Sequence, residues 1–132
     1  MTVFVDTSAL LPLLDESDDD HGAVVAALQE LAHQQEQLIT SSYTMVEAAA
    51  LVKRRLGAIA FKRLGEVAGR AMRIIWVDEE LHERAWERAA DQGRDGPSLV
   101  DCTSFLVMCD NGVTRALALD DHFRGEGFQT VP

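Results

Sequence analysis

The sequence predicts an α/β fold: a three-layer α/β/α sandwich around a mostly parallel central sheet of four to five strands. Short apolar runs alternate along the chain with longer segments of helical periodicity, and parallel strands need such crossover helices. The 132 residues suit one domain with a hydrophobic core of its own, and no repeat, low-complexity tract or long linker divides them. We therefore expect residues 1–132 to form a single domain.

At the start of the chain, the apolar run 2–5 (TVFV) is typical of a strand that is buried on both faces. Ser8 is the expected cap of a helix over residues 9–14, because a serine hydroxyl accepts a hydrogen bond from a free amide of the first turn. The acidic run 15–20 (DESDDD) precedes a helix expected over 20–35. Negative charge complements the helix dipole there, so we interpret the run as a cap rather than a metal site.

The rest of the chain repeats this alternation. Gly57 and Gly112 mark helix ends, because glycine favours the backbone conformation that terminates helices. Ser41 or Ser42 is the expected cap of the third helix, and Ser98 of the last. Strands are expected at residues 38–40, 74–77, 116–119 and 128–131, and helices at 42–56, 58–72, 79–92 and 98–112.

Four acidic residues are unusual because each stands alone in an apolar segment or closes one. Asp6 is the only charged side chain of MTVFVDTSALLPLL, Glu47 of LITSSYTMVEAAALV and Asp101 of GPSLVDCTSFLVMC, and Asp120 closes the run ALAL. A small domain buries such segments, and a buried carboxylate is costly unless a cation or hydrogen bonds compensate it. Acids placed this way indicate a site whose natural partner is a divalent metal ion.

The expected positions of these acids bring them to one edge of the sheet. Asp6 and Asp120 directly follow strands, and the carboxyl ends of parallel strands form the edge where ligands bind. Glu47 lies in the helix after the second strand. Asp101 lies in the first turn of the late helix, where free amides stabilise negative charge.

Some of these observations also have structural explanations. Asp101 can close a capping box with Ser98, and Asp120 with Asp121 is compatible with an ordinary turn. We interpret His122, beside that turn, as a structural hydrogen-bonding residue rather than a general base. The coincidence of all four acids is what favours a site.

Clustered carboxylates need compensating charge. Two of them about 4 Å apart repel by roughly 4 kcal/mol at an effective dielectric constant of about 20. Four cannot all stay ionised at neutral pH unless protons or cations join them. Oxygen ligands without histidine or thiolate favour Mg²⁺ or Mn²⁺, and either ion suits phosphate-ester hydrolysis because it activates water and stabilises charge on phosphoryl oxygens.

The formal net charge of −10 argues against the broadly basic surface that is usual in nucleic-acid-binding proteins. A basic window in the middle of the chain softens this objection, because it fits either a phosphate-binding surface or a solvated helix face. No uncharged run reaches the roughly 18 residues of a membrane span, and the N-terminal apolar run lacks a basic start, so we expect a cytoplasmic protein. The window, opposed only by Glu66, consists of Lys53, Arg54, Arg55, Lys62, Arg63, Arg70 and Arg73.

Taken in their order along the chain, the motifs Asp6-Thr7-Ser8, the lone Glu47, Ser98-x-x-Asp101 and Asp120-x-His122-Phe123 resemble those of a PIN domain. More narrowly, they resemble the VapC-type toxin ribonucleases of prokaryotic toxin–antitoxin pairs. The resemblance spans nearly the whole chain and implies a PIN-like fold. It also implies a Mg²⁺- or Mn²⁺-dependent endoribonuclease that cuts structured RNA with metal-activated water and leaves 5′-phosphate ends.

The resemblance also implies roles and partners. Asp6 and Asp101 would be the principal metal ligands. Glu47 and Asp120 would complete the catalytic quartet by ligating a metal or orienting the attacking water, and Ser8 would be a supporting polar contact. Members of the family are commonly homodimers, inhibited by a small antitoxin protein that often places a basic side chain among the acids, where a guanidinium replaces the missing cation. The expected partners are therefore RNA, an antitoxin and a second copy, with no membrane.

Other classes fit less well. A two-component receiver domain needs paired acids after the first strand and a lysine after a late strand, but Asp6 has no acidic neighbour and the only lysines are Lys53 and Lys62. A haloacid-dehalogenase-type phosphatase needs Asp-x-Asp where this chain has Asp6-Thr7-Ser8. The remaining alternative is a PIN-like module that has lost catalysis and serves in binding or assembly, and the intact quartet argues against it.

Overall fold

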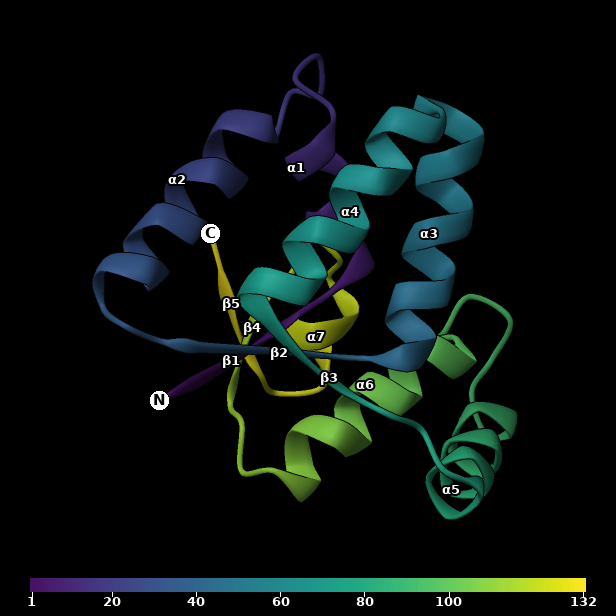
Figure 1. The fold of residues 1–132 in the computed structure, drawn as a ribbon. Coiled ribbons are helices and arrows are strands. Elements are labelled where there is room, and N and C mark those ends of the chain that lie inside the picture. The colour runs from purple at the N-terminus through teal and green to yellow at the C-terminus, as the bar shows by residue number, and fades with distance from the viewer.

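A single parallel sheet forms the centre of the computed structural model, which describes residues 1–132 (Figure 1). The strands lie in the order β3-β2-β1-β4-β5, and every neighbouring pair is parallel. The predicted α/β sandwich is confirmed, with five strands and a sheet that is wholly rather than mostly parallel. The strands are β1 (Thr2–Val5), β2 (Gln37–Ser41), β3 (Met72–Ile75), β4 (Arg115–Leu117) and β5 (Gln129–Val131).

Helices cover both faces of the sheet. One core contains Val3 and Val5 of β1 and lies under helices α1 to α4, and the other contains Phe4 and lies under α5 to α7. Because consecutive strand residues point to opposite faces, β1 contributes to both cores. No helix combines the length and apolarity that crossing a membrane requires. The helices are α1 (Thr7–Leu14), α2 (His21–His33), α3 (Ser42–Leu56), α4 (Ala58–Ala71), α5 (Glu79–Ala90), α6 (Leu99–Asp110) and α7 (His122–Gly125).

The strand order creates a crevice at the carboxyl edge of the sheet. Strands β2 and β3 lie on one side of the central strand β1, and β4 and β5 lie on the other, so the order of the strands reverses at β1. In parallel sheets this reversal is the point where ligands bind. Val5 pairs with Leu117, and the amide of Asp6 donates to the Leu117 carbonyl at 3.0 Å, so the segments after β1 and β4 are neighbours.

Every predicted element matches an observed one within two residues at each end, and the one strand shifted by two residues at both ends has a physical cause. The strand expected at 74–77 is Met72–Ile75, because Met72 already pairs with Leu38 of β2, and the preceding helix ends at Ala71 accordingly. Helix α7 was not predicted, because a single turn shows no helical periodicity.

Two predicted caps are wrong. Asp6, not Ser8, caps α1, since the Asp6 carboxylate accepts a hydrogen bond from the Ser8 amide. The acidic run 15–20 gives α2 no side-chain cap. Asp18 Oδ1 instead accepts from the amide of Asp20 at 2.8 Å, a local turn that keeps the loop compact.

Candidate metal centre at the carboxyl edge of the sheet

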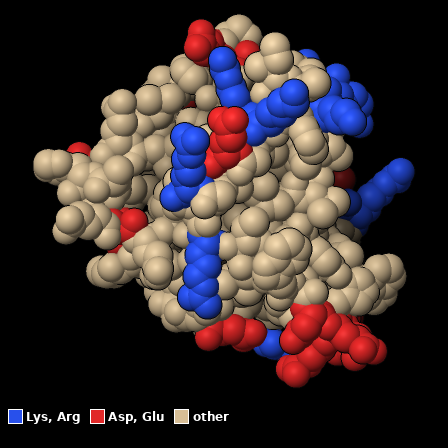
Figure 2. All heavy atoms as spheres, in the orientation of Figure 1, with Lys and Arg blue, Asp and Glu red and all other residues tan.

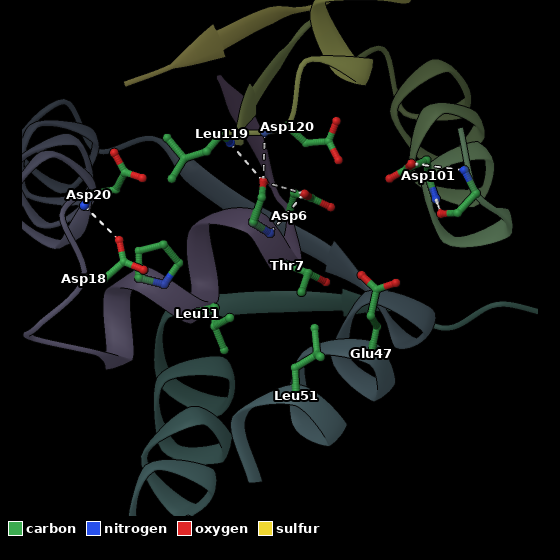
Figure 3. Close-up of a pocket in the computed structure, with 13 residues that line it drawn as sticks. Asp6, Thr7, Leu11, Asp18, Asp20, Glu47, Leu51, Asp101, Leu119 and Asp120 are labelled. Atoms are coloured by element: carbon green, nitrogen blue, oxygen red, sulfur yellow. Dashed lines mark hydrogen bonds between the residues drawn. The ribbon is translucent and has the colours of Figure 1, made fainter. Parts of the chain in front are cut away.

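A pocket of about 570 Å³ opens at the carboxyl edge of the sheet, between α1, α3, α6 and the segment after β4 (Figure 3). All four acids singled out in the sequence line it: Asp6, Glu47, Asp101 and Asp120. They belong to four separate parts of the chain, so only the fold brings them together. Their convergence is a property of the structure, whereas their chemical roles stay a prediction.

Asp6 is the most deeply buried of these acids, with 3% of its surface exposed. Its Oδ2 accepts hydrogen bonds from the amide of Ser8 at 3.1 Å and from the Ser8 hydroxyl at 2.7 Å. Burial raises the pKa of Asp6 from 3.8 to about 6; the bonds from Ser8 oppose this rise, and the charges of Asp101 and Glu47 add to it. At neutral pH this carboxylate is therefore ionised at a cost that a cation in the pocket would remove.

The Ser8 hydroxyl joins two sides of the site. It donates to Asp6 and accepts from the amides of Leu119 at 2.9 Å and Asp120 at 3.3 Å. These bonds fix the segment after β4 against the start of α1, which places Asp120 beside Asp6 (Figure 3). The geometry thus gives Ser8 a supporting role between two acids.

Asp101 lies in the first turn of α6 and is 9% exposed. Its Oδ2 accepts from the Ser98 amide at 3.1 Å, and the Ser98 hydroxyl accepts from the Asp101 amide at 3.1 Å, so the expected capping box forms. This structural role does not exclude a second one. Only one of the two carboxylate oxygens of Asp101 takes part in the box.

The His122 side chain contacts two of the acids. Its Nδ1 is 3.0 Å from Oδ2 of Asp101 and 3.2 Å from Oδ1 of Asp120, and the three residues offer atoms that all lie within 4.8 Å of one another. Nδ1 must carry a proton to bond a carboxylate, so it donates to these acids. Burial by itself lowers the pKa of His122, but the hydrogen bond to Asp101 and the charges of Asp120 and Asp101 outweigh burial and raise it.

The sequence prediction placed no histidine among the acids, whereas the structure adds His122 beside Asp101 and Asp120. The sequence did contain a usable sign, the spacing Asp120-x-His122. The carboxylate of Asp120 accepts from the amide of His122 at 2.8 Å, and this local turn directs the imidazole back toward the site.

Three of the site carboxylates use one oxygen for hydrogen bonds within the protein and leave the other oxygen free. Asp6 and Asp101 use only Oδ2 for bonds within the protein, and Asp120 uses only Oδ1. Glu47 projects into the pocket from α3, and no protein group bonds its carboxylate (Figure 3). No lysine or arginine pairs with any of the four acids, since every arginine ion pair lies elsewhere. Free oxygens without an internal cation fit a hard divalent ion.

Two further acids line the pocket and were not assigned to it from the sequence. Asp18 and Asp20, in the loop between α1 and α2, lie across the pocket from Asp101 (Figure 3). They belong to the acidic run that was interpreted as a cap, and nothing in that run separates residues that face the pocket from residues that face water. Asp121 is exposed and pairs with Arg124, so it stays outside the site.

The PIN domain family model matches residues 3–125, and the chain belongs to this family. Two curated relatives share 34% identity with it over 134 aligned residues, covering 98% of this chain and 97% of theirs. Both are the 23S rRNA-specific endonuclease VapC20, from two strains of Mycobacterium tuberculosis. The resemblance to VapC-type PIN domains is thereby confirmed.

Solved structures agree with this assignment. The crystal structure of Mycobacterium tuberculosis VapC20, described as a sarcin–ricin loop cleaving toxin, matches with a TM-score of 0.83 at 30% identity, covering 96% of this chain and 95% of that one. FitAcB from Neisseria gonorrhoeae gives 0.66 at 18% identity, covering 100% and 97%. VapBC2 from Rickettsia felis, bound to a promoter DNA fragment, gives 0.68 at 11% identity, covering 98% and 97%. The last two likenesses concern the fold only.

Proposed function

We propose that this protein is a divalent-metal-dependent endoribonuclease, the toxin of a VapBC-type pair, which hydrolyses phosphodiester bonds of RNA. One observation carries the proposal: four acids from separate segments, none paired with a basic side chain, share a pocket at the ligand-binding edge of a PIN fold. A module that had lost catalysis would have no use for this arrangement, because uncompensated carboxylates destabilise the fold.

The residues of the chain prepare this pocket for hydrolysis. Asp6 and Asp101 present one free oxygen each, held in place by Ser8 and Ser98 through the other. Glu47 keeps both oxygens unbonded and is the carboxylate best placed to orient an attacking water and accept its proton. When bound, Mg²⁺ or Mn²⁺ supplies charge neutralisation, a more acidic water and stabilisation of the phosphoryl oxygens.

The relatives indicate which RNA to test first. VapC20 is described as specific for 23S rRNA and as cleaving the sarcin–ricin loop. Since the likeness covers nearly the whole of both chains, we propose a structured ribosomal RNA loop as the substrate class of this protein. A ribosomal substrate supports the cytoplasm as the proposed location of the enzyme.

An apolar pocket on the other side of α1 supports a helical antitoxin as partner. It measures about 270 Å³, lies between α1, α2 and α4 above the sheet, and is lined by nine apolar side chains and Gln29. An exposed apolar groove of this kind suits the apolar face of an amphipathic helix. The antitoxin would also supply the basic side chain that no residue of this chain provides to the acids.

An aromatic surface on α5 supports a homodimer. Trp86 is 60% exposed, and Val46 on α3 is 70% exposed. The His82 ring connects them, because it lies 5.8 Å from the Trp86 ring and 5.8 Å from the ring of Tyr43, one turn before Val46. Tryptophan is enriched in protein interfaces. Trp86→Glu should halve the mass measured by sedimentation equilibrium, and a monomeric wild type would contradict this assignment.

Cleavage of 23S rRNA, mapped by primer extension with Mn²⁺ or with chelator, tests the proposed activity. We expect one or a few cuts with 5′-phosphate ends in Mn²⁺ and none in chelator. Asp101→Asn should lower cleavage by roughly a hundredfold or more, since it removes a ligand charge but keeps the shape. Asp110→Asn, at the far end of the same helix, is the matched control. Full cleavage in chelator would contradict the proposal, and full cleavage by Asp101→Asn would remove Asp101 from the mechanism.

A further inference from the structure

Most of the basic residues that make no ion pair lie in one segment of the chain. Of the 12 lysines and arginines, four are in ion pairs, namely Arg84, Arg88, Arg115 and Arg124, which leaves eight. Seven of those eight lie between residues 53 and 73. Figure 2 shows basic side chains gathered over the region of α3 and α4, whereas acidic side chains gather at the lower right, where α5 lies in Figure 1. Most of the unpaired positive charge therefore belongs to one helical hairpin.

Two of these cations continue the row of α3 residues that lines the acidic pocket. Glu47 and Leu51 belong to that row. Since an α-helix advances about 100° per residue, Arg54 projects about 20° from the direction of Glu47, and Arg55 about 40° from that of Leu51. Both arginines are exposed, in the last turn of α3, about 10–12 Å along the helix axis from Glu47. They lie on the pocket-lining side of α3, beyond Leu51, and are not themselves among the residues that line the pocket.

We propose that Arg54 and Arg55 hold the phosphate backbone of the RNA strand that enters the acidic pocket. The inference rests on the proposed ribonuclease function and names the face by which the substrate approaches. A guanidinium matches a phosphate with two parallel hydrogen bonds and stays charged at every relevant pH. Because the pocket itself is anionic, attraction for a polyanion has to come from residues beside it.

Neighbouring residues strengthen the positive potential around this pair. Lys53 lies with its ammonium 5.7 Å from the centre of the Phe61 ring, so the end of α3 and the start of α4 are adjacent. Lys62 and Arg63 follow in the first turns of α4 and are exposed. A cluster in which one sign predominates, here opposed only by Glu66, steers an oppositely charged ligand toward a neighbouring cleft. The hairpin thus offers a cationic approach to an acidic reaction site.

The test compares two double variants that change the net charge equally. Arg54→Gln with Arg55→Gln removes the proposed contacts, whereas Arg70→Gln with Arg73→Gln removes two exposed cations at the other end of α4 and in β3. Binding of a fluorescent RNA hairpin is measured by anisotropy over a series of salt concentrations, in the non-cleaving Asp101→Asn background. The first pair should weaken binding roughly tenfold at about 0.15 M salt and lower the slope of log K against log salt by about 1.4 to 1.8. The second pair should change neither quantity.

Cleavage by the same pairs with Asp101 intact gives the second measurement. Loss of Arg54 and Arg55 should raise KM and leave kcat unchanged, since these side chains bind substrate away from the reacting bond. Equal affinity and equal salt slope for the two pairs would overturn the inference. A loss of affinity that accompanies a change in sedimentation would assign the surface to a protein contact and overturn it as well. Absence of any cleavage by the wild type would instead overturn the proposed function, and the binding data would still decide on the arginines.

Discussion

The variant Asp6→Asn measures how much the buried charge of Asp6 destabilises the folded protein. Asparagine keeps the acceptor oxygen that receives both hydrogen bonds from Ser8, but it cannot ionise. Burial raises the pKa of Asp6 from 3.8 to about 6, so the folded state favours the protonated carboxyl. Stability from this preference is fully present below pH 3.8 and is lost as the pH rises through about 6.

The size of the effect follows from the same two values. A tenfold change in proton affinity is worth about 1.36 kcal/mol, so the rise from 3.8 to about 6 corresponds to at most about 3 kcal/mol. Relative to the wild type without metal, Asp6→Asn should therefore gain up to about 3 kcal/mol of unfolding free energy between about pH 4 and pH 7.5. Urea unfolding in chelator, followed by circular dichroism at several pH values, measures this gain. Asp19→Asn removes the same charge at an exposed position and is the control.

Metal should narrow the stability difference between the two proteins. Mn²⁺ removes the repulsion that burdens the wild type, whereas the variant has lost a ligand and gains little. At neutral pH we expect the variant to be the more stable protein in chelator and the wild type to gain more from Mn²⁺. A stability difference that is the same at every pH would refute the assignment of this cost to Asp6.

Three further outcomes are expected. Ser8→Ala should lower the free energy of unfolding by about 1–3 kcal/mol, because it removes the hydroxyl that links Asp6 to the segment after β4. Its cleavage rate should fall by a larger factor than this loss of stability explains. Ser8→Thr keeps the hydroxyl and should retain more stability and more cleavage than Ser8→Ala. Mn²⁺ at about 100 times its Kd should stabilise the wild type by about 2.7 kcal/mol, seen as a higher Tm, and Asp101→Asn should lose most of this gain. His122→Ala should lower kcat about 10- to 100-fold with the fold intact, since it removes the hydrogen bond that orients Asp101, and an unchanged kcat would make the imidazole dispensable.

The fold was predictable because its determinants are local and periodic. In the run Val3-Phe4-Val5, the two valines enter one core and the phenylalanine enters the other. The strand also pairs with a neighbour on each side, and an uninterrupted apolar run predicts such a central, doubly buried strand. The start of β3 was not predictable, because Met72 is as compatible with the end of α4 as with a strand, and only its pairing with β2 decides. Tertiary pairing overrides local preference at such boundaries.

The site was predictable to the extent that its residues contrast with their neighbours. Asp6 and Asp101 are charges in apolar segments, and such a contrast is visible in a sequence. Asp18 and Asp20 stand among other acids, so only the fold of their loop shows that they reach the pocket. The turn between Asp120 and His122 is local and its spacing is visible in the sequence, whereas the contact of His122 with Asp101 joins residues 21 apart and depends on the fold.

The hydrogen bond that the Asp120 amide donates to the Ser8 hydroxyl joins residues 112 positions apart in the sequence. A ribosome making this chain must therefore synthesise β4 and the following segment before the acidic quartet exists, and every shorter intermediate lacks one wall of the pocket. The activity proposed above therefore requires translation to have passed residue 120.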